Sequence, residues 1–108
     1  MSSFPYSAYN PVSLSQVRPD GWIMEFLKRQ CAGITGHPQA SGYPFDHSFW
    51  GNPTQAPDVL DPGMVWWPYE QTAYRLDGAL KAGYLTGDEE VYRMALAEID
   101  QALAPAAP

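Results

Sequence analysis

Apolar side chains recur with a helical period in the stretch that follows residue 20. One helix face there carries apolar residues at i, i+3, i+4, i+8 and i+11: Ile23, Phe26, Leu27, Cys31 and Ile34. Asp20 is placed to accept hydrogen bonds from the backbone of the first turn, and Gly33 and Gly36 are placed to end the helix. The pattern therefore predicts a helix over residues 21–33.

Two more periodic stretches occupy the C-terminal third of the chain. Pro68 suits the first position of a helix because it has no N–H to leave unpaired, and an apolar face follows it: Tyr69, Ala73, Leu76, Leu80 and Tyr84. Gly87 is placed for the left-handed residue that closes this helix, and Asp88 for the N-cap of the next. A third apolar face spans residues 89–103: Tyr92, Leu96, Ile99 and Leu103. Residues 68–104 are thus predicted to form an αα-hairpin with a very short link.

The rest of the chain shows no period. Residues 1–19 contain three prolines with tyrosines between them and predict an extended arm. Residues 36–63 hold five prolines and several aromatic side chains, so this loop is predicted to pack its aromatic side chains against another surface. A short helical turn is predicted around residues 46–50. Residues 105–108 form a tail. Because no strand pattern occurs, the predicted fold class is all-α, with about three helices over residues 20–104 and long loops rich in aromatic residues and proline.

The composition narrows the class of partner. The 108 residues carry a net charge of −6, and the six Lys and Arg residues are scattered, whereas binding to a phosphate backbone needs clustered cations. No apolar run approaches the roughly 18 residues that span a bilayer. The N-terminal segment has no basic part followed by an apolar stretch, and a single cysteine suits a reducing compartment. We therefore predict a cytoplasmic protein that binds neither nucleic acid nor membrane.

A metal site or a cysteine nucleophile is not indicated. Four potential ligands share the long loop: His37, Asp46, His47 and Asp58. Their spacing matches no zinc pattern, so we interpret them as surface or turn residues. Cys31 lies on the apolar face of the first predicted helix, where a cysteine is usually a small buried hydrophobe. No metal ligand, cofactor or catalytic residue is therefore predicted in this chain.

The stretch WWPYEQTAY, residues 66–74, places a carboxylate and several aromatic rings at the start of the second predicted helix. Glu70 either complements the positive end of that helix or binds sugar hydroxyls beside aromatic walls that stack on the sugar ring. Glu70 and Asp77 do not form the acid pair of a glycosidase. Their Cα atoms are expected about 10.5 Å apart on one helix, and both side chains project in the same direction, so they cannot flank a glycosidic bond.

Three stretches in a pattern that extends over about residues 17–100 resemble the N-terminal part of the β-L-arabinofuranosidase-like glycoside hydrolases: VRPDGWIMEFLKRQCAGITG, FWGNP and WWPYEQTAYRLDGALKAGYLTGDEEVYRMA. That family is built on an (α/α)6 toroid of paired helices, so the resemblance implies a partial (α/α) toroid here. The most specific element is the run W-x-x-E-x-x-x-Y from Trp67 through Glu70 to Tyr74.

The resemblance implies a division between binding and catalytic residues. It assigns substrate binding to Trp67, Glu70 and Tyr74, and it places the loop that carries His47 and Trp50 at the same mouth of the barrel. The family's cysteine nucleophile, held by zinc, and its glutamate acid/base lie later in the chain. Nothing in this sequence matches those positions.

Three hypotheses for function follow. The leading one is an N-terminal piece of a glycoside hydrolase that binds an arabinose-containing oligosaccharide, with zinc belonging only to the complete enzyme. This piece is expected to be inactive by itself, because three helices cannot close a toroid and the nucleophile is absent. The alternatives are a small helical module that binds a protein partner and a non-catalytic carbohydrate-binding fragment. Because so few helices bury too little surface for an independent core, we also expect a homo-oligomer formed through exposed aromatic surface, a loosely packed monomer, or aggregation.

Overall fold

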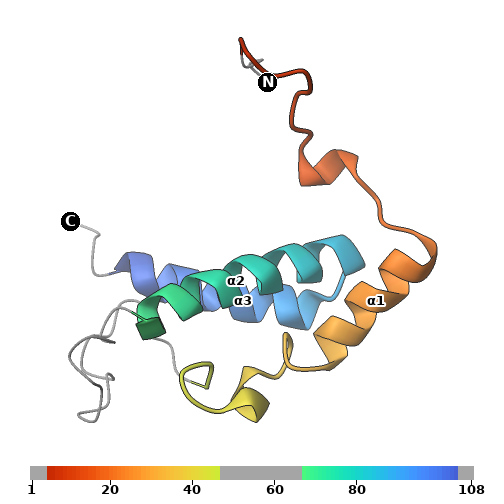
Figure 1. Ribbon diagram of the computed structural model, residues 1–108. Coiled ribbons are helices and arrows are strands. Elements are labelled where there is room, and N and C mark those ends of the chain that lie inside the picture. Colours follow the sequence, from red (N-terminus) through yellow and green to blue (C-terminus); the bar gives the residue numbers. More distant parts are fainter. Residues whose placement is uncertain (1–4, 47–66, 105–108) are drawn as a thin grey trace.

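The computed structural model describes residues 5–46 and 67–104, and its regular structure is helical (Figure 1). Three α-helices occur in these residues: α1 (Gly21–Ala32), α2 (Trp67–Thr86) and α3 (Glu89–Leu103). Two 3-10 turns accompany them: η1 (Leu14–Gln16) and η2 (Pro38–Ser41). No strand occurs in the described residues, and none of their helices combines the length and apolar character that crossing a membrane requires. The all-α class is confirmed, whereas the toroid stays a prediction.

Both ends of α1 lie within one residue of the predicted bounds. At the N-terminus, the Asp20 carboxylate accepts a 2.8 Å hydrogen bond from the backbone N–H of the next residue. At the other end, the Gly33 N–H donates to the carbonyl groups of Arg29 and Gln30, at 2.9 and 3.1 Å. The helix therefore ends at Ala32, and Gly33 is its cap.

The link between α2 and α3 has the predicted chemistry. Gly87 has a φ of 73°, the left-handed conformation that closes a helix. The Asp88 carboxylate caps α3 by accepting a hydrogen bond from the Val91 N–H at 3.2 Å. The α2 helix begins at Trp67, one residue before the predicted Pro68, and α3 has the predicted bounds. The two helices run antiparallel and lie side by side (Figure 1).

Small side chains let α2 and α3 pack closely. The buried hydrophobic residues of the core are mostly small: Cys31, Leu76, Ala79, Ala82, Val91 and Ala95. The helices approach one another at Gly83, where an added Cβ atom would lie only 2.7 Å from the Tyr92 backbone nitrogen. Of the apolar face predicted for α2, only Leu76 is fully buried. The buried face is rotated toward the small residues, because larger side chains would hold the two helices apart.

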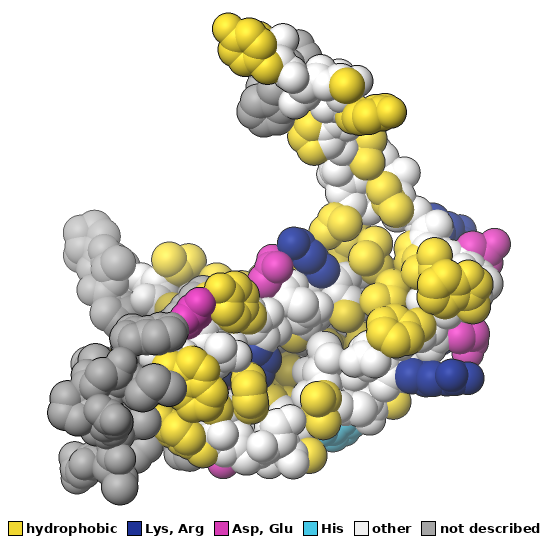
Figure 2. All heavy atoms as spheres, in the orientation of Figure 1, with side chains coloured by type: hydrophobic (Ala, Val, Ile, Leu, Met, Phe, Trp, Pro, Cys, Tyr) yellow, Lys and Arg dark blue, Asp and Glu magenta, His cyan; other side chains and the backbone are white. Residues whose placement is uncertain are grey.

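The apolar face predicted for α1 is mostly exposed, which differs from the expectation for a core helix. Ile23, Phe26 and Ile34 are 46, 54 and 61% exposed, and Cys31 is the member of this face that is buried. The C-terminal half of α1 lies against α2, whereas its first turns extend beyond the α2–α3 pair (Figure 1). Figure 2 shows hydrophobic side chains gathered over this end of the molecule.

The N-terminal arm projects away from the three helices (Figure 1). Every residue from 5 to 18 is exposed, and Tyr6 and Tyr9 are 101 and 88% exposed. The sequence predicts an extended arm, but the structure differs in one place, because η1 forms within the arm. Its first turn is capped by Ser13, whose hydroxyl accepts a 3.3 Å hydrogen bond from the Ser15 N–H.

Candidate functional site

Three of the five predicted substrate-binding residues come together at the start of α2. Trp67 opens the helix, and Glu70 and Tyr74 follow at spacings that place neighbouring side chains on one side of it. We call these three residues the Glu70 site. The other two, His47 and Trp50, lie outside the described residues, as does most of the short helical turn predicted in the same loop. The candidate site is therefore built from the first two turns of α2.

Glu70 and Tyr74 form a hydrogen bond across one helical turn. The Tyr74 hydroxyl donates to Glu70 Oε1 at 2.7 Å, while the tyrosine stays 64% exposed. This hydrogen bond, followed by the negative charge of Glu70 and by desolvation, raises the pKa of Tyr74 above its ordinary value of 10.0. The bond fixes the direction of the Glu70 carboxylate at a place that a ligand can reach.

An aromatic pair connects the loop after η2 to the start of α2. The rings of Tyr43 and Trp67 have their centroids 6.2 Å apart and their planes at 54°, within the range of favourable tilted contacts. Burial, followed by the charge of Tyr69, raises the pKa of Tyr43 above 10.0. Trp67 is half-buried, so part of the indole remains available close to Glu70.

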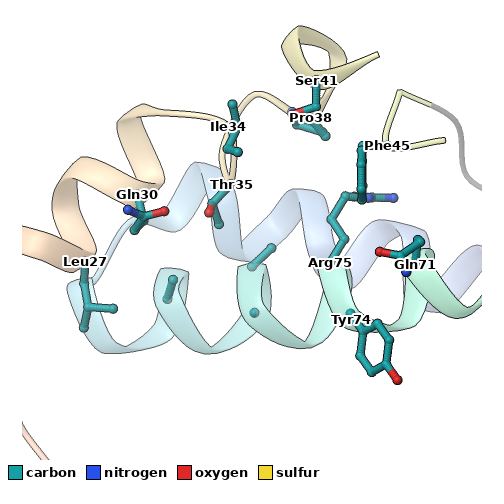
Figure 3. Close-up of a pocket in the computed structure, with 13 residues that line it drawn as sticks. Leu27, Gln30, Ile34, Thr35, Pro38, Ser41, Phe45, Gln71, Tyr74 and Arg75 are labelled. Carbon is teal, nitrogen blue, oxygen red and sulfur yellow. The ribbon is translucent and has the colours of Figure 1, made fainter. Parts of the chain in front are cut away.

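A groove of about 440 Å³ adjoins the Glu70 site (Figure 3). It lies between α1, η2 and α2, and Leu27 and Ile34 contribute to its wall on the α1 side. Gly78 and Ala79 of α2 line it with almost no side chain of their own. Tyr74 also lines the groove and belongs to the Glu70 site. Tyr74 is therefore common to the groove and the Glu70 site.

An ion pair beside the groove was not predicted from the sequence. Arg75 of α2 donates from Nη2 to Glu98 Oε1 of α3 at 3.0 Å, and its Nη1 lies 2.8 Å from Oε2 as an ion pair without hydrogen-bond alignment. The Arg75 side chain is 7% exposed and that of Glu98 is 21% exposed. The Arg75 Nε has no hydrogen-bond partner in the described part of the chain. This pair joins α2 to α3 across their contact.

The described residues do not fit the zinc centre that the resemblance implies for a complete enzyme. Within residues 5–46 and 67–104, no three His, Cys, Asp or Glu side chains converge as metal ligands. Cys31 is buried, as predicted, and its Sγ lies 3.6 Å from Thr86 Oγ1. No metal chemistry follows from these residues.

Comparisons with known proteins do not assign the chain to a family. No family model matches it, and neither a curated protein nor a solved structure does. The resemblance to glycoside hydrolases therefore depends on the three sequence stretches alone, and function has to be argued from the Glu70 site and the groove.

Proposed function

We propose that this chain is the N-terminal part of a glycoside hydrolase similar to the β-L-arabinofuranosidases, and that its Glu70 site binds the saccharide. The observation that supports this most is an accessible carboxylate held in place by a phenol, with the Glu70–Tyr74 hydrogen bond at 2.7 Å. Trp67 lies one turn before it. A sugar carries hydroxyl groups around its edge and C–H groups on its faces, so a carboxylate beside aromatic rings suits both.

Each side chain of the Glu70 site has its own part in this binding. The Glu70 carboxylate accepts hydrogen bonds from sugar hydroxyls, and hydrogen bonds to a charged group contribute about 1.5–3 kcal/mol. The Tyr74 hydroxyl orients that carboxylate, and the exposed parts of Tyr74 and Trp67 cover the C–H face of the sugar. The proposed ligand is an arabinose-containing oligosaccharide, on the strength of the resemblance.

Cleavage is not expected from this chain by itself. The Asp77 carboxylate is paired with Lys81 at 3.0 Å along the helix surface, so it does not face Glu70 across a glycosidic bond. The proposed role of the chain is therefore to supply substrate-binding residues, while the nucleophile and zinc belong to the rest of a complete enzyme. We also propose a cytoplasmic location, because a single cysteine suits a reducing compartment.

Calorimetric titration of the Glu70→Gln variant with L-arabinose and a short arabinoside tests this proposal. Loss of the charge is expected to weaken binding by roughly tenfold to a hundredfold. The free energy of unfolding is expected to change by less than about 1 kcal/mol, since Glu70 otherwise complements the helix end and accepts an exposed hydrogen bond from Tyr74 that glutamine can still accept. Asp77→Asn, in the same helix, is the matched control and should leave affinity unchanged. Equal affinity of Glu70→Gln and wild type would leave Glu70 with structural roles only, at the helix end and as the acceptor for Tyr74.

A second candidate function is a module that binds a protein partner. It is favoured by the apolar surface of α1, where Trp22 is 78% and Phe26 54% exposed. Exposed apolar patches of this kind mark interaction surfaces in soluble proteins. A carbohydrate-binding fragment without any enzyme is the third candidate, and it shares the Glu70→Gln experiment with the first.

A further inference from the structure

The groove beside the Glu70 site extends well beyond the residues that a single sugar would contact. Figure 3 shows Leu27 at one end of the groove, and Gln71 and Tyr74 at the other end, where α2 begins. Its volume of about 440 Å³ lies within the range of roughly 300–1,000 Å³ that is usual for small-molecule sites. A sugar at Glu70 and Tyr74 accounts for one end only, so the rest of the groove calls for a second part of the ligand.

The lining of the groove is electrically neutral. Among the described residues that line it, Arg75 is the one that carries a charge, and both of its terminal nitrogens face the Glu98 carboxylate, at 2.8 and 3.0 Å. No carboxylate of the described residues lines the groove. A charged ligand would lose hydration there without gaining an opposite charge. The occupant is therefore a neutral molecule.

Much of the wall of the groove is apolar, and the side formed by α2 carries little side-chain volume. The apolar side chains come from α1 and from the loop that follows it: Leu27, Ile34, Pro38 and Phe45. On α2, a Cβ atom added to Gly78 would lie more than 4 Å from every atom of the described part of the chain outside its own stretch of helix. A flat apolar ring or a short hydrocarbon chain can therefore lie against α2, and both of its faces leave water when it does.

Two amide side chains offer hydrogen bonds from opposite sides of the groove. Gln30 belongs to α1 and Gln71 to α2, and both residues are half-buried. Neither side chain takes part in a hydrogen bond with the described residues. Each amide has an acceptor and two donor hydrogens, so it can form a favourable hydrogen bond with a neutral polar atom of a ligand. The occupant thus combines apolar surface with hydroxyl or ether oxygens.

We propose that the groove binds the apolar aglycone of a neutral glycoside whose sugar is bound by Glu70 and Tyr74. This inference rests on the proposed function, because Tyr74 belongs to both the Glu70 site and the groove. Gln71 lines the groove at the same end as Tyr74, so its amide can form a hydrogen bond with a neutral oxygen of a ligand bound there. The ligand class is accordingly an aryl or alkyl glycoside without a charged group.

The test compares three ligands on the purified protein by titration calorimetry: L-arabinose, phenyl L-arabinofuranoside and 4-carboxyphenyl L-arabinofuranoside. The phenyl glycoside is expected to bind about tenfold more tightly than the free sugar. The carboxyphenyl glycoside is expected to lose that gain because the groove has no free positive charge. The variant Gly78→Leu fills the groove from an open position on α2 and should remove the gain of the phenyl group while the affinity for L-arabinose stays the same. Gly78→Ala, which adds one methyl group, is the matched control and should keep the gain.

The outcomes separate this inference from the proposed function. If L-arabinose binds but the phenyl group adds nothing, or if its gain survives Gly78→Leu, the aglycone groove is overturned and the Glu70 site stands. If phenol binds and phenyl arabinofuranoside does not compete with it, the groove is an apolar site unconnected with sugar, and the inference is overturned. If L-arabinose also fails to bind, the proposed function fails as well. Glu70→Gln should lower the affinities for L-arabinose and phenyl arabinofuranoside by the same factor. Gly78→Leu should lower only the affinity for phenyl arabinofuranoside.

Discussion

At the scale of single residues, the Glu70–Tyr74 hydrogen bond leads to a prediction about titration. A raised pKa means that the neutral phenol is favoured in the folded protein, so the bond stabilises the fold below pH 10.0, and this contribution is lost as the pH rises through the raised pKa of Tyr74. Glu70→Ala removes both the acceptor and the charge, and we expect the Tyr74 pKa to fall back toward 10.0. Glu70→Gln keeps an acceptor and should give an intermediate value.

NMR titration of ring-labelled tyrosine measures this shift, and the Tyr74→Phe variant assigns the signal. The other tyrosines serve as internal references because their environment does not include Glu70 within hydrogen-bond distance in the described residues. A Tyr74 titration that is the same in Glu70→Ala and wild type would show that the hydrogen bond does not form in solution.

The buried ion pair between Arg75 and Glu98 leads to a prediction about stability. Glu98→Gln leaves the guanidinium buried without its countercharge. Removing one partner of a fully buried pair costs roughly 3–5 kcal/mol, and because Glu98 is 21% exposed we expect a loss of about 2–3 kcal/mol. Urea unfolding measures the change. The control is Asp77→Asn at the exposed pair with Lys81, which should cost less than about 1 kcal/mol. Equal effects of the two variants would contradict the burial of Arg75.

The proximity of Glu70 and Tyr74 could be predicted from the sequence, whereas the ion pair between Arg75 and Glu98 could not, because the first contact lies within one helix and the second joins two helices. Glu70 and Tyr74 are four residues apart on one helix, a spacing that makes their side chains neighbours on its surface. Arg75 and Glu98 meet only because two helices pack against each other. Arg75 precedes Ala79 by four residues, and therefore shares its buried face, but a charged residue is normally assigned to the solvent side of a helix.

At the scale of elements, the same distinction holds between helix ends and helix faces. The φ of Gly87 and the cap formed by Asp88 depend on neighbouring residues only, and the sequence predicts them correctly. The exposure of Ile23 and Phe26 depends on how far α2 reaches along α1, which the apolar period of α1 does not encode. Periodicity predicts that a helix has an apolar face, but the element that covers this face depends on how the other helices pack.

Two glycines of α2 lead to opposite predictions for one substitution. In Gly83→Ala the new methyl group would lie 2.7 Å from the Tyr92 backbone nitrogen, so α3 has to move, and we expect a loss of about 1–3 kcal/mol. In Gly78→Ala the methyl group has no neighbour within 4 Å among residues 5–46 and 67–104, and the better helix propensity of alanine should stabilise the protein by up to about 1 kcal/mol. Urea unfolding of both variants measures these changes in the free energy of unfolding. A stabilising Gly83→Ala would mean that α2 and α3 lie further apart than described.

At the scale of the whole molecule, the chain is less compact than its length suggests. Its radius of gyration is 16.5 Å, where a compact domain of this length has about 13 Å. The projecting arm and the first turns of α1 contribute to this difference (Figure 1). They also carry many of the exposed hydrophobic side chains visible in Figure 2. Surface of this kind is available for association.

We propose that a second copy of the chain covers the apolar face of α1, and this proposal predicts a concentration-dependent mass. Trp22 and Phe26 are four residues apart and 78 and 54% exposed, so replacing both with serine should leave the fold stable and shift the protein toward monomer. Sedimentation velocity over a range of concentrations measures the change. The control replaces the exposed pair Glu25 and Lys28 in the same helix. A wild-type protein that stays monomeric at every concentration would refute the association.

The burial of Cys31 has a consequence for the kinetics of the molecule. It is the single thiol of the chain, it is 3% exposed, and its Sγ lies 3.6 Å from Thr86 Oγ1 at the junction of α1 with α2. A thiol reagent can reach it only while α1 is lifted from that junction. The rate of modification, divided by the rate for the denatured chain, therefore gives the free energy of this local opening. Comparison with the free energy of global unfolding then shows whether α1 leaves while α2 and α3 stay together, or whether all three helices separate in one step.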